Sequence, residues 1–330
     1  MNVAVFDTHR FERNYFEKAN EPFSHALTFF DARLTNQTAK LAFGYSCVCC
    51  FVNDVLDIET LGIIKDFDVR LIALRSAGYN NVNIQEAHRL GFKVVRVPAY
   101  SPNAVAEHAT ALLLSLNRKI HKSYARVREL NFSLDGLVGF DLYGKSVGVI
   151  GTGKIGAVFA KIMAGFGCRV LAHDLSPDRD LQVNPNIRYV PLDQIYRESD
   201  IISLHVPLTL KTHHLISAAA IDLMKPGVIL INTGRGALID AKALVQALKS
   251  EKVGGAGLDV YEEEENLFFE DRSSKILQDD VLARLLTFPN VIVTSHQGFL
   301  TREALQNIAM TTLQNISDFE NGKPLINEVT

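Results

Sequence analysis

Two polar side chains in this chain follow short apolar runs of the kind that form buried strands. Arg235 lies between two glycines after the run at residues 228–231, and His296 follows the run at 291–293. In open α/β sheets, ligands bind beyond the carboxyl ends of the strands, so both side chains are candidates for contact with a substrate. An arginine on such a loop can bind a carboxylate through two parallel hydrogen bonds, and a histidine can exchange a proton near neutral pH.

Together with a carboxylate, these residue types could support hydride transfer to a 2-oxo acid. The guanidinium would hold the substrate carboxylate, and the imidazole would protonate the carbonyl oxygen as hydride reaches the carbonyl carbon. The acidic run at residues 262–265 could supply a carboxylate that favours a protonated imidazole. Each feature also has an ordinary explanation, as a surface cation, a structural histidine or a solvated acidic turn.

A glycine-rich turn, Gly-Thr-Gly-Lys-Ile-Gly, predicts where a dinucleotide would bind. It follows a strand-like run and opens a segment with helical spacing. Gly151 permits a tight turn, Gly153 lets the backbone approach a pyrophosphate, and Gly156 lets helix and strand pack closely. Lys154 and Ile155 would begin the helix beside the phosphates. The alternative is a glycine turn in an ordinary strand–helix unit.

The identity of the dinucleotide is predicted by an acidic residue after the next strand-like run. Asp174 stands 18 residues beyond Gly156. A carboxylate at this place accepts hydrogen bonds from the ribose hydroxyls of NAD and repels the 2′-phosphate of NADP. The spacing therefore predicts NAD as the cofactor.

The strand-like runs form two series, one before and one after the glycine turn, with helical segments between them. The runs lie at residues 3–6, 47–52, 71–74 and 94–97, and then at 170–173, 201–204, 228–231, 257–258 and 291–293. This alternation is typical of an α/β fold. We expect two doubly wound parallel-sheet domains, Rossmann-like or flavodoxin-like, separated by a cleft.

Two helical patterns suggest where the domains begin and end. An Ala- and Leu-rich pattern at residues 104–117, introduced by Pro102, is expected to cross from the first domain to the second. The pattern at 301–319 could pack back onto the first domain. The expected domains are a discontinuous substrate-binding domain of residues 1–100 plus 300–330 and an NAD-binding domain of residues 101–299.

The composition favours a globular protein with a small-molecule ligand. The 330 residues are 47% hydrophobic and 22% charged, with a net charge of −3, and this length suggests two domains. Because no lysine or arginine block occurs, neither nucleic acid nor a membrane is an expected partner. The N-terminus resembles a strand rather than a signal peptide, and no apolar run reaches the ~20 residues that span a bilayer. We therefore expect a cytoplasmic protein.

Cys47 and Cys50 have the C-x-x-C spacing of a redox or zinc half-site. They lie in a run typical of a buried strand, where the two side chains would point to opposite faces, and no second ligand pair follows. We expect no metal site.

The whole chain resembles the NAD-dependent D-2-hydroxyacid dehydrogenases, and within them the D-lactate dehydrogenase subgroup. The likeness is carried by residues 149–156, by Ser-Leu-His-Val-Pro-Leu-Thr at 203–209, Asn-Thr-Gly-Arg-Gly-Ala-Leu-Ile-Asp at 232–240, Gly-Leu-Asp-Val-Tyr-Glu at 257–262 and Ser-His-Gln-Gly-Phe-Leu-Thr at 295–301. The family's catalytic arginine, glutamate and histidine correspond to Arg235, Glu264 and His296. The glutamate is the fifth residue after Asp259, which selects Glu264 from its acidic neighbours.

The resemblance implies an activity and further contacts. The implied reaction is the reduction of pyruvate to D-lactate with NADH, in a homo-oligomer such as a dimer or tetramer. Aromatic residues at 51, 100 and 299 would favour a short substrate side chain. The implied cofactor contacts also include Val206, Pro207, Thr233 and Asp259, and the implied substrate contacts are Ala77, Gly78, Tyr100 and Phe299.

Two alternatives to pyruvate reduction remain open at this stage. Other members of the family reduce glyoxylate, hydroxypyruvate or branched 2-oxo acids with the same three residues. The fold also resembles NADH-sensing co-repressors, although their long polar tails are absent here. The sequence departs from the family in one place, because the proline usual after the glutamate is missing.

Overall fold

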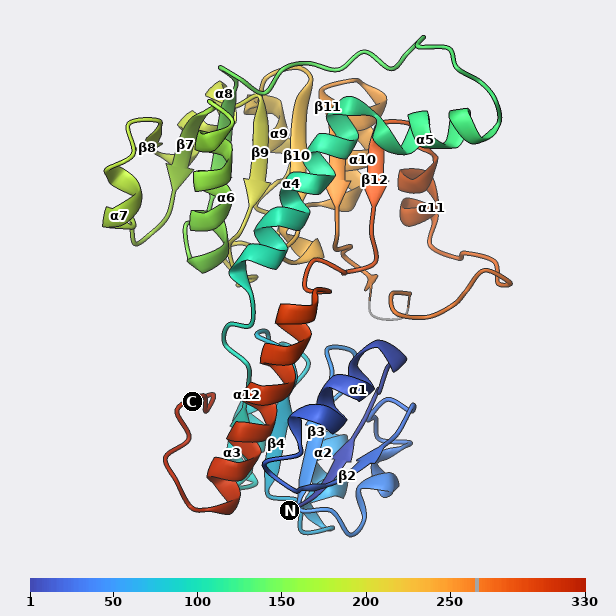
Figure 1. Cartoon of the computed structure of the whole chain (residues 1–330), viewed down its shortest axis with the longest axis vertical. Coiled ribbons are helices and arrows are strands. Elements are labelled where there is room, and N and C mark those ends of the chain that lie inside the picture. The colour runs from blue at the N-terminus through green and yellow to red at the C-terminus, as the bar shows by residue number, and fades with distance from the viewer. Residues whose placement is uncertain (265–266) are drawn as a thin grey trace. The chain divides into compact units, whose positions relative to one another are not determined.

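The computed structural model describes residues 1–264 and 267–330, and the chain divides into two compact units. Unit 1 comprises Met1–Ser101 and Leu300–Thr330, and unit 2 comprises Pro102–Phe299. Each unit contains a parallel sheet with helices packed on it (Figure 1). The expected α/β class with two doubly wound parallel sheets is confirmed.

Unit 1 contains a five-stranded sheet with the order β2-β1-β3-β4-β5, in which all neighbouring strands are parallel. Its strands are β1 (Asn2–Val5), β2 (Ala26–Phe29), β3 (Cys47–Cys50), β4 (Leu71–Leu74) and β5 (Lys93–Val95). Its helices are α1 (Arg10–Ala19), the 3₁₀ helix η1 (Ala39–Ala42), α2 (Ile58–Lys65), α3 (Ile84–Arg89) and α12 (Arg302–Glu320).

Helix α12 brings the C-terminal segment back to unit 1. Thr301 caps its first turn by accepting a hydrogen bond from the N–H of Ala304. The helix packs on α1 and β4, and Figure 1 shows it in red beside the dark-blue α1. Its buried residues recur at helical spacing, as the pattern at residues 301–319 predicts.

Unit 2 contains a seven-stranded parallel sheet with the order β12-β11-β10-β9-β6-β7-β8. Its strands are β6 (Ser146–Ile150), β7 (Arg169–His173), β8 (Ile187–Tyr189), β9 (Ile201–Leu204), β10 (Val228–Asn232), β11 (Val253–Leu258) and β12 (Val291–Val293). Its helices are α4 (Pro102–Arg118), α5 (Ile120–Arg128), α6 (Lys154–Gly165), α7 (Arg179–Gln182), α8 (Leu192–Glu198), α9 (Ala218–Leu223), η2 (Gly236–Leu238), α10 (Ala241–Lys249) and α11 (Asp280–Thr287).

One expectation about the helices is wrong. The helix predicted at residues 104–117 does not cross between domains, because α4 begins with the first residue of unit 2 and packs on α6 and β11. Helix α4 packs closely on β11 because that strand has glycines at the contact. An added Cβ at Gly255 would lie 3.0 Å from Leu116, and one at Gly257 would lie 3.2 Å from Leu112. The apolar face of α4 therefore covers a strand surface that glycines leave flat.

The cysteines take part in packing. Within the described part of the chain, Cys47, Cys49, Cys50 and Cys168 are all buried free thiols. Burial raises the pKa of each thiol, which disfavours the reactive thiolate. None of the described helices combines the length and the apolar character needed to cross a membrane.

Candidate active site

The glycine turn of unit 2 leads from β6 into the N-terminus of α6. Gly151 has a φ of +93°, and a Cβ at this position would lie 2.6 Å from the backbone oxygen of His205. A Cβ at Gly156 would lie 1.9 Å from the backbone oxygen of Gly151, so only glycine lets the helix start so close to the turn. Gly153 is the N-cap of α6, and a Cβ there would meet nothing within 4 Å. The open space beside this helix N-terminus fits a pyrophosphate.

Asp174 follows β7 and is held by the same turn. Its Oδ2 accepts hydrogen bonds from the backbone N–H and hydroxyl of Thr152 at 2.6 and 3.3 Å, and its Oδ1 accepts from the N–H of Ser176 at 2.8 Å. Burial opposes ionisation, but these hydrogen bonds outweigh it and lower the pKa of Asp174. The residue therefore carries a negative charge at neutral pH where ribose hydroxyls would donate hydrogen bonds.

Tyr189 on β8 forms hydrogen bonds with the residues that flank Asp174. Its hydroxyl donates to the Oγ1 of Thr152 at 2.7 Å and accepts from the N–H of Asp178 at 2.9 Å. No sequence pattern predicts this contact, because β8 is an edge strand of only three residues. Tyr189 connects the glycine turn to the loop that follows Asp174.

Three other predicted cofactor contacts lie at the carboxyl ends of neighbouring strands. Val206 and Pro207 follow β9, and a Cβ at Gly151 would lie 2.8 Å from a methyl group of Val206. Thr233 follows β10 and is buried, yet its Oγ1 has no hydrogen-bond partner among the residues that the structure describes. A buried hydroxyl of this kind fits a polar group of a bound ligand. These features together fit a dinucleotide along this edge of the sheet.

His296 and Glu264 are in direct contact. The Nδ1 of His296 lies 2.6 Å from the Oε1 of Glu264, and both side chains are mostly buried. The Oε2 of Glu264 accepts a hydrogen bond from the N–H of Tyr261 at 2.8 Å. Because the carboxylate occupies Nδ1, the Nε2 of His296 is the ring nitrogen available for proton exchange. Glu265, the last residue of the acidic run, lies outside the described residues.

The loop that carries His296 is held by Asp259. Its backbone oxygen accepts from the N–H of His296 at 2.7 Å. Its carboxylate accepts from the N–H groups of Gln297 and Gly298 at 2.8 and 2.7 Å and from the hydroxyl of Thr294 at 2.5 Å. Burial opposes ionisation of Asp259, but hydrogen bonds from His108, Thr294 and the loop lower its pKa. These hydrogen bonds give Asp259 a part in positioning the loop, and its contact with the cofactor stays a prediction.

His108 completes this arrangement and was missed by the sequence analysis. It lies on α4, and its Nε2 is 3.2 Å from the Oδ1 of Asp259 and 3.1 Å from the Oγ1 of Thr294. The one feature of the sequence that could have drawn attention to His108 is that a histidine stands in an Ala- and Leu-rich helix. Its partners are about 150 to 190 residues away in the chain, so the sequence alone could not identify them.

Arg235 lies on the loop between β10 and η2. Asn232 shapes this loop, because its side chain donates to the backbone oxygen of Arg235 at 2.9 Å and accepts from the N–H of Gly234 at 3.0 Å. A Cβ at Gly236 would lie 2.0 Å from the backbone of Tyr261, so the Arg235 loop packs directly on the segment that leads to Glu264. The guanidinium itself donates to the backbone oxygen of Gly234 at 2.8 Å and is half-buried.

Comparison with known proteins identifies the family. Residues 110–298 match the model of the NAD-binding domain of D-isomer-specific 2-hydroxyacid dehydrogenases. The chain belongs to this family. Because the matched domain is the family's NAD-binding domain, the cofactor is NAD, as the position of Asp174 predicts.

The likeness to individual family members extends over the full length. The chain is 51% identical over 329 residues to D-lactate dehydrogenase of Escherichia coli strain K12, covering 100% of both chains. The apo structure of D-lactate dehydrogenase from E. coli matches with a TM-score of 0.91 at 49% identity, covering 100% of both chains. D-lactate dehydrogenase from Aquifex aeolicus, complexed with NAD and lactic acid, matches with a TM-score of 0.89 at 34% identity, covering 99% of each chain.

The predicted substrate contacts of this dehydrogenase fall mainly on unit 1. Ala77 and Gly78 lie in the turn after β4, where the hydroxyl of Ser76 donates to the backbone oxygen of Gly78 at 2.7 Å. Arg96 fixes the same turn by donating to the backbone oxygen of Ala77 at 2.7 Å. The backbone oxygen of Tyr100 accepts from Asn307 of α12 at 2.7 Å. Phe299 is the last residue of unit 2 and is buried.

A second histidine–carboxylate pair occurs beside the acidic run of this dehydrogenase. The Nε2 of His214 lies 2.6 Å from the Oε1 of Glu262, and possible ligand atoms of His213, His214 and Glu262 lie within 4.8 Å of one another. The two imidazole rings stack with centroids 3.9 Å apart and an interplanar angle of 28°. The contact between His214 and Glu262 joins the loop after β9 to the loop after β11.

Proposed function

We propose that this dehydrogenase reduces pyruvate to D-lactate with NADH and also runs in reverse. The observation that carries the proposal is the contact between His296 and Glu264 at 2.6 Å, because it forms an acid–base pair on the sheet edge that holds the dinucleotide turn. Full-length identity of 51% to D-lactate dehydrogenase of E. coli supports pyruvate as the substrate.

Each of the three residues has a distinct role in this reaction. Bound NADH supplies the hydride. Arg235 binds the substrate carboxylate through its planar fork, which orients the carbonyl group. His296 donates a proton from Nε2 to the carbonyl oxygen and takes it back in the oxidative direction. Glu264 stabilises the protonated imidazole and fixes the ring orientation through Nδ1.

We further propose that the backbone of Ala77 and Gly78 binds the substrate carboxylate and that Tyr100 and Phe299 contact the substrate methyl group. Aromatic side chains at these positions, with Phe51, would disfavour long substrate side chains. One methylene changes selectivity in an apolar pocket by only about 10- to 200-fold, so other 2-oxo acids would still react slowly.

A panel of 2-oxo acids tests the proposal. Pyruvate, glyoxylate, hydroxypyruvate and a branched 2-oxo acid are each reduced while NADH absorbance is followed, and the lactate formed is separated on a chiral column. We expect the highest kcat/KM with pyruvate and D-lactate as the product. A higher kcat/KM with another acid would assign the chain to a different activity within the family, and L-lactate or no turnover would contradict the proposal.

We propose that the protein is a homo-oligomer, either a dimer or a tetramer, in the cytoplasm. Helix α5 has no buried residue, and Tyr124 on it and Phe132 after it are 65% and 69% exposed. Their segment is nevertheless held in place, because Arg126 donates to the backbone oxygen of Asp135 at 2.7 Å. An ordered apolar surface of this kind is typical of a subunit interface. Four buried free thiols suit a reducing compartment.

Light scattering after size-exclusion chromatography tests the oligomer. We expect a mass of two or four chains for the native protein and a smaller mass for Phe132→Asp. A monomeric native protein would contradict this part of the proposal and leave the proposed reaction unaffected.

A further inference from the structure

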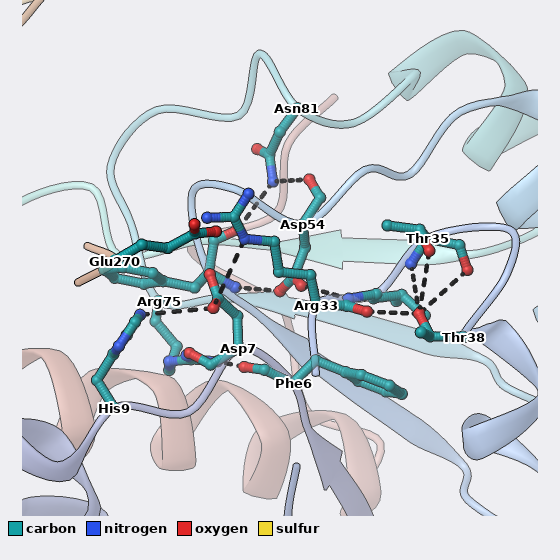
Figure 2. A network of polar contacts seen from close by, with 12 residues as sticks. Phe6, Asp7, His9, Arg33, Thr35, Thr38, Asp54, Arg75, Asn81 and Glu270 are labelled. Carbon is teal, nitrogen blue, oxygen red and sulfur yellow. Dashed lines mark hydrogen bonds and ion pairs between the residues drawn. The ribbon is translucent and has the colours of Figure 1, made fainter. Parts of the chain in front are cut away.

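Three loops meet at the carboxyl edge of the unit 1 sheet around one buried carboxylate. They are the loop after β2 (residues 30–38), the loop after β3 (51–57) and the loop after β4 (75–83). Asp54 is 0% exposed and lies where they meet, as Figure 2 shows. Its Oδ1 accepts a hydrogen bond from the N–H of Leu34 at 2.6 Å, and its Oδ2 accepts from the N–H of Phe51 at 2.6 Å.

The two hydrogen bonds of Asp54 are strongest when its carboxylate is ionised. Each oxygen accepts from a backbone N–H, and a proton on either oxygen would make that oxygen a weaker acceptor. Burial raises the pKa of Asp54 to about 7, while the two N–H groups and the charge of Arg75 act in the opposite direction. Asp7, Cys49 and Cys50 also interact electrostatically with Asp54. Asp54 therefore changes its charge near neutral pH.

Arg75 provides a buried positive charge in this region. It is buried, and its guanidinium donates to both carboxylate oxygens of Glu12 at 2.9 and 3.0 Å and to the backbone oxygens of Phe6, Asp7 and Cys49. It also lies 5.2 Å from the ring centroid of Phe51. Because Nε, Nη1 and Nη2 of the guanidinium all donate hydrogen bonds, Arg75 is held in one position beside the ring of Phe51.

Asn81 connects the Asp54 loop to the turn that contains Ala77 and Gly78. Its side-chain N–H₂ donates to the backbone oxygens of Phe51 and Asp54, each at 2.9 Å. Its backbone oxygen accepts from the N–H of Leu56 at 3.0 Å. The position of the loop after β4 therefore depends on the conformation of the loop after β3, which Asp54 holds.

We propose that Asp54 is a positioning residue for substrate binding: through Phe51 and Asn81, its ionised carboxylate fixes the loop that presents Ala77 and Gly78 to a 2-oxo acid. The inference rests on the proposed function for the identity of the ligand. Loss of the negative charge loosens this loop, so the affinity for the 2-oxo acid falls while the affinity for NADH, which binds to unit 2, stays the same.

Steady-state kinetics of Asp54→Asn between pH 5.5 and 8.5 test the proposal. At pH 8 we expect the KM for pyruvate to rise about tenfold, with kcat changed less than threefold and NADH affinity unchanged. In the native enzyme the KM for pyruvate should rise as the pH falls below about 7, and this rise should be absent in Asp54→Asn. The pH dependence that arises at His296 is common to both proteins, so the difference between the native enzyme and Asp54→Asn isolates the effect of Asp54.

Two further variants make the kinetic result specific. Asn81→Ala removes the connection but keeps the carboxylate, so the KM for pyruvate should rise at pH 8 and its further increase at low pH should be smaller than in the native enzyme. Asp200→Asn is the control, because that carboxylate lies in unit 2 and accepts from the N–H of Ser146 at 2.9 Å and from Lys225 at 2.8 Å. It should leave the KM for pyruvate unchanged. A native KM in Asp54→Asn, or an equal rise in Asp200→Asn, would overturn the proposal.

Hydrogen–deuterium exchange tests the same coupling without turnover. Residues 76–83 should exchange at least fivefold faster in Asp54→Asn than in the native protein, and Asp200→Asn should leave them unchanged. If Asp54→Asn fails to fold, Asn81→Ala provides the same comparison. Native protein that reduces no 2-oxo acid would defeat the proposed function, whereas unchanged exchange in the variants would defeat the role of Asp54.

Discussion

Glu264 and His296 form a pair in which the carboxylate is held from both sides. One of its oxygens lies 2.6 Å from the Nδ1 of His296, and the other accepts from the N–H of Tyr261 at 2.8 Å. The backbone bond prevents the carboxylate from rotating away, so the imidazole keeps one orientation. The pair of His214 and Glu262 is different. It joins two loops, and the carboxylate of Glu262 also accepts from the N–H of Ala241 at the start of α10.

Glu264→Gln should lower kcat/KM for pyruvate by about 100-fold, because an amide does not stabilise the protonated imidazole as a carboxylate does. The loss should appear first at neutral to alkaline pH, where the imidazole is most easily deprotonated. A pH profile of kcat/KM from pH 5.5 to 9 measures it. Glu263→Gln, a change at the exposed neighbour, is the control and should behave like the native enzyme. An unchanged profile in Glu264→Gln would contradict the role of this carboxylate.

Arg235→Gln should reduce kcat/KM for pyruvate by about 100-fold while leaving NADH affinity nearly intact, because the lost group binds the substrate carboxylate. Arg235→Lys keeps the charge but not the planar fork, so it should recover only part of the loss. NADH affinity is measured by fluorescence titration and the rest by steady-state kinetics. Loss of NADH binding in Arg235→Gln would place this arginine in the cofactor site instead.

The sequence reveals the fully buried strands and, among the described edge strands, β5 and β12. All residues of β3, β4, β6, β9 and β10 are buried, so these strands are largely apolar in sequence. The edge strands β2 and β8 were not predicted. Strand β2 alternates between exposed and half-buried residues, and β8 has only three residues, so neither contains a run of buried residues.

Strand β11 was predicted too short for a different reason. The predicted run covers residues 257–258, but the strand begins at Val253. Gly254 lies between, and a Cβ there would stand 2.5 Å from the backbone oxygen of Gly227. Close packing requires glycine at this position, and glycine in a strand weakens the sequence pattern.

Prediction of the candidate site has the same limit, because a local sequence pattern reveals some of its residues and not others. Motifs predict residues that face a ligand, and Arg235, Glu264 and His296 were predicted in this way. Residues that hold the loops in place, such as His108 at the loop of His296 and Tyr189 at the loop of Asp174, act through contacts between segments that are distant in the sequence. Their roles follow from the fold and have no local pattern.

Tyr189→Phe should weaken NADH binding about fivefold, because the hydroxyl links Thr152 to the loop after Asp174 and a single hydrogen bond contributes ~1 kcal/mol. At saturating NADH, kcat and the KM for pyruvate should stay close to native. Fluorescence titration with NADH measures the change. Tyr143→Phe removes an exposed hydroxyl and is the control. If NADH affinity in Tyr189→Phe equals that of the native enzyme, Asp174 does not depend on this support.

Asp259→Asn should both destabilise the protein and slow the reaction, because the carboxylate holds the loop of His296 through hydrogen bonds to Thr294, Gln297 and Gly298. An amide nitrogen would face at least one backbone N–H. We expect a loss of about 2 kcal/mol in the free energy of unfolding at pH 7 and a fall in kcat. Urea unfolding and steady-state kinetics measure the two effects.

The pH dependence of this destabilisation follows from the lowered pKa of Asp259. An ordinary aspartate titrates near ~3.9 in the unfolded chain, and the folded value lies below it. The carboxylate therefore stabilises the fold fully above about pH 4, and this contribution is lost as the pH falls through the folded pKa. The difference in unfolding free energy between native protein and Asp259→Asn should shrink between pH 5 and 3. His108→Gln removes one partner of the carboxylate. Its difference from the native protein in unfolding free energy should be smaller than that of Asp259→Asn and should also shrink between pH 5 and 3. A difference that stays constant down to pH 3 would show that the charge of Asp259 does not hold this loop.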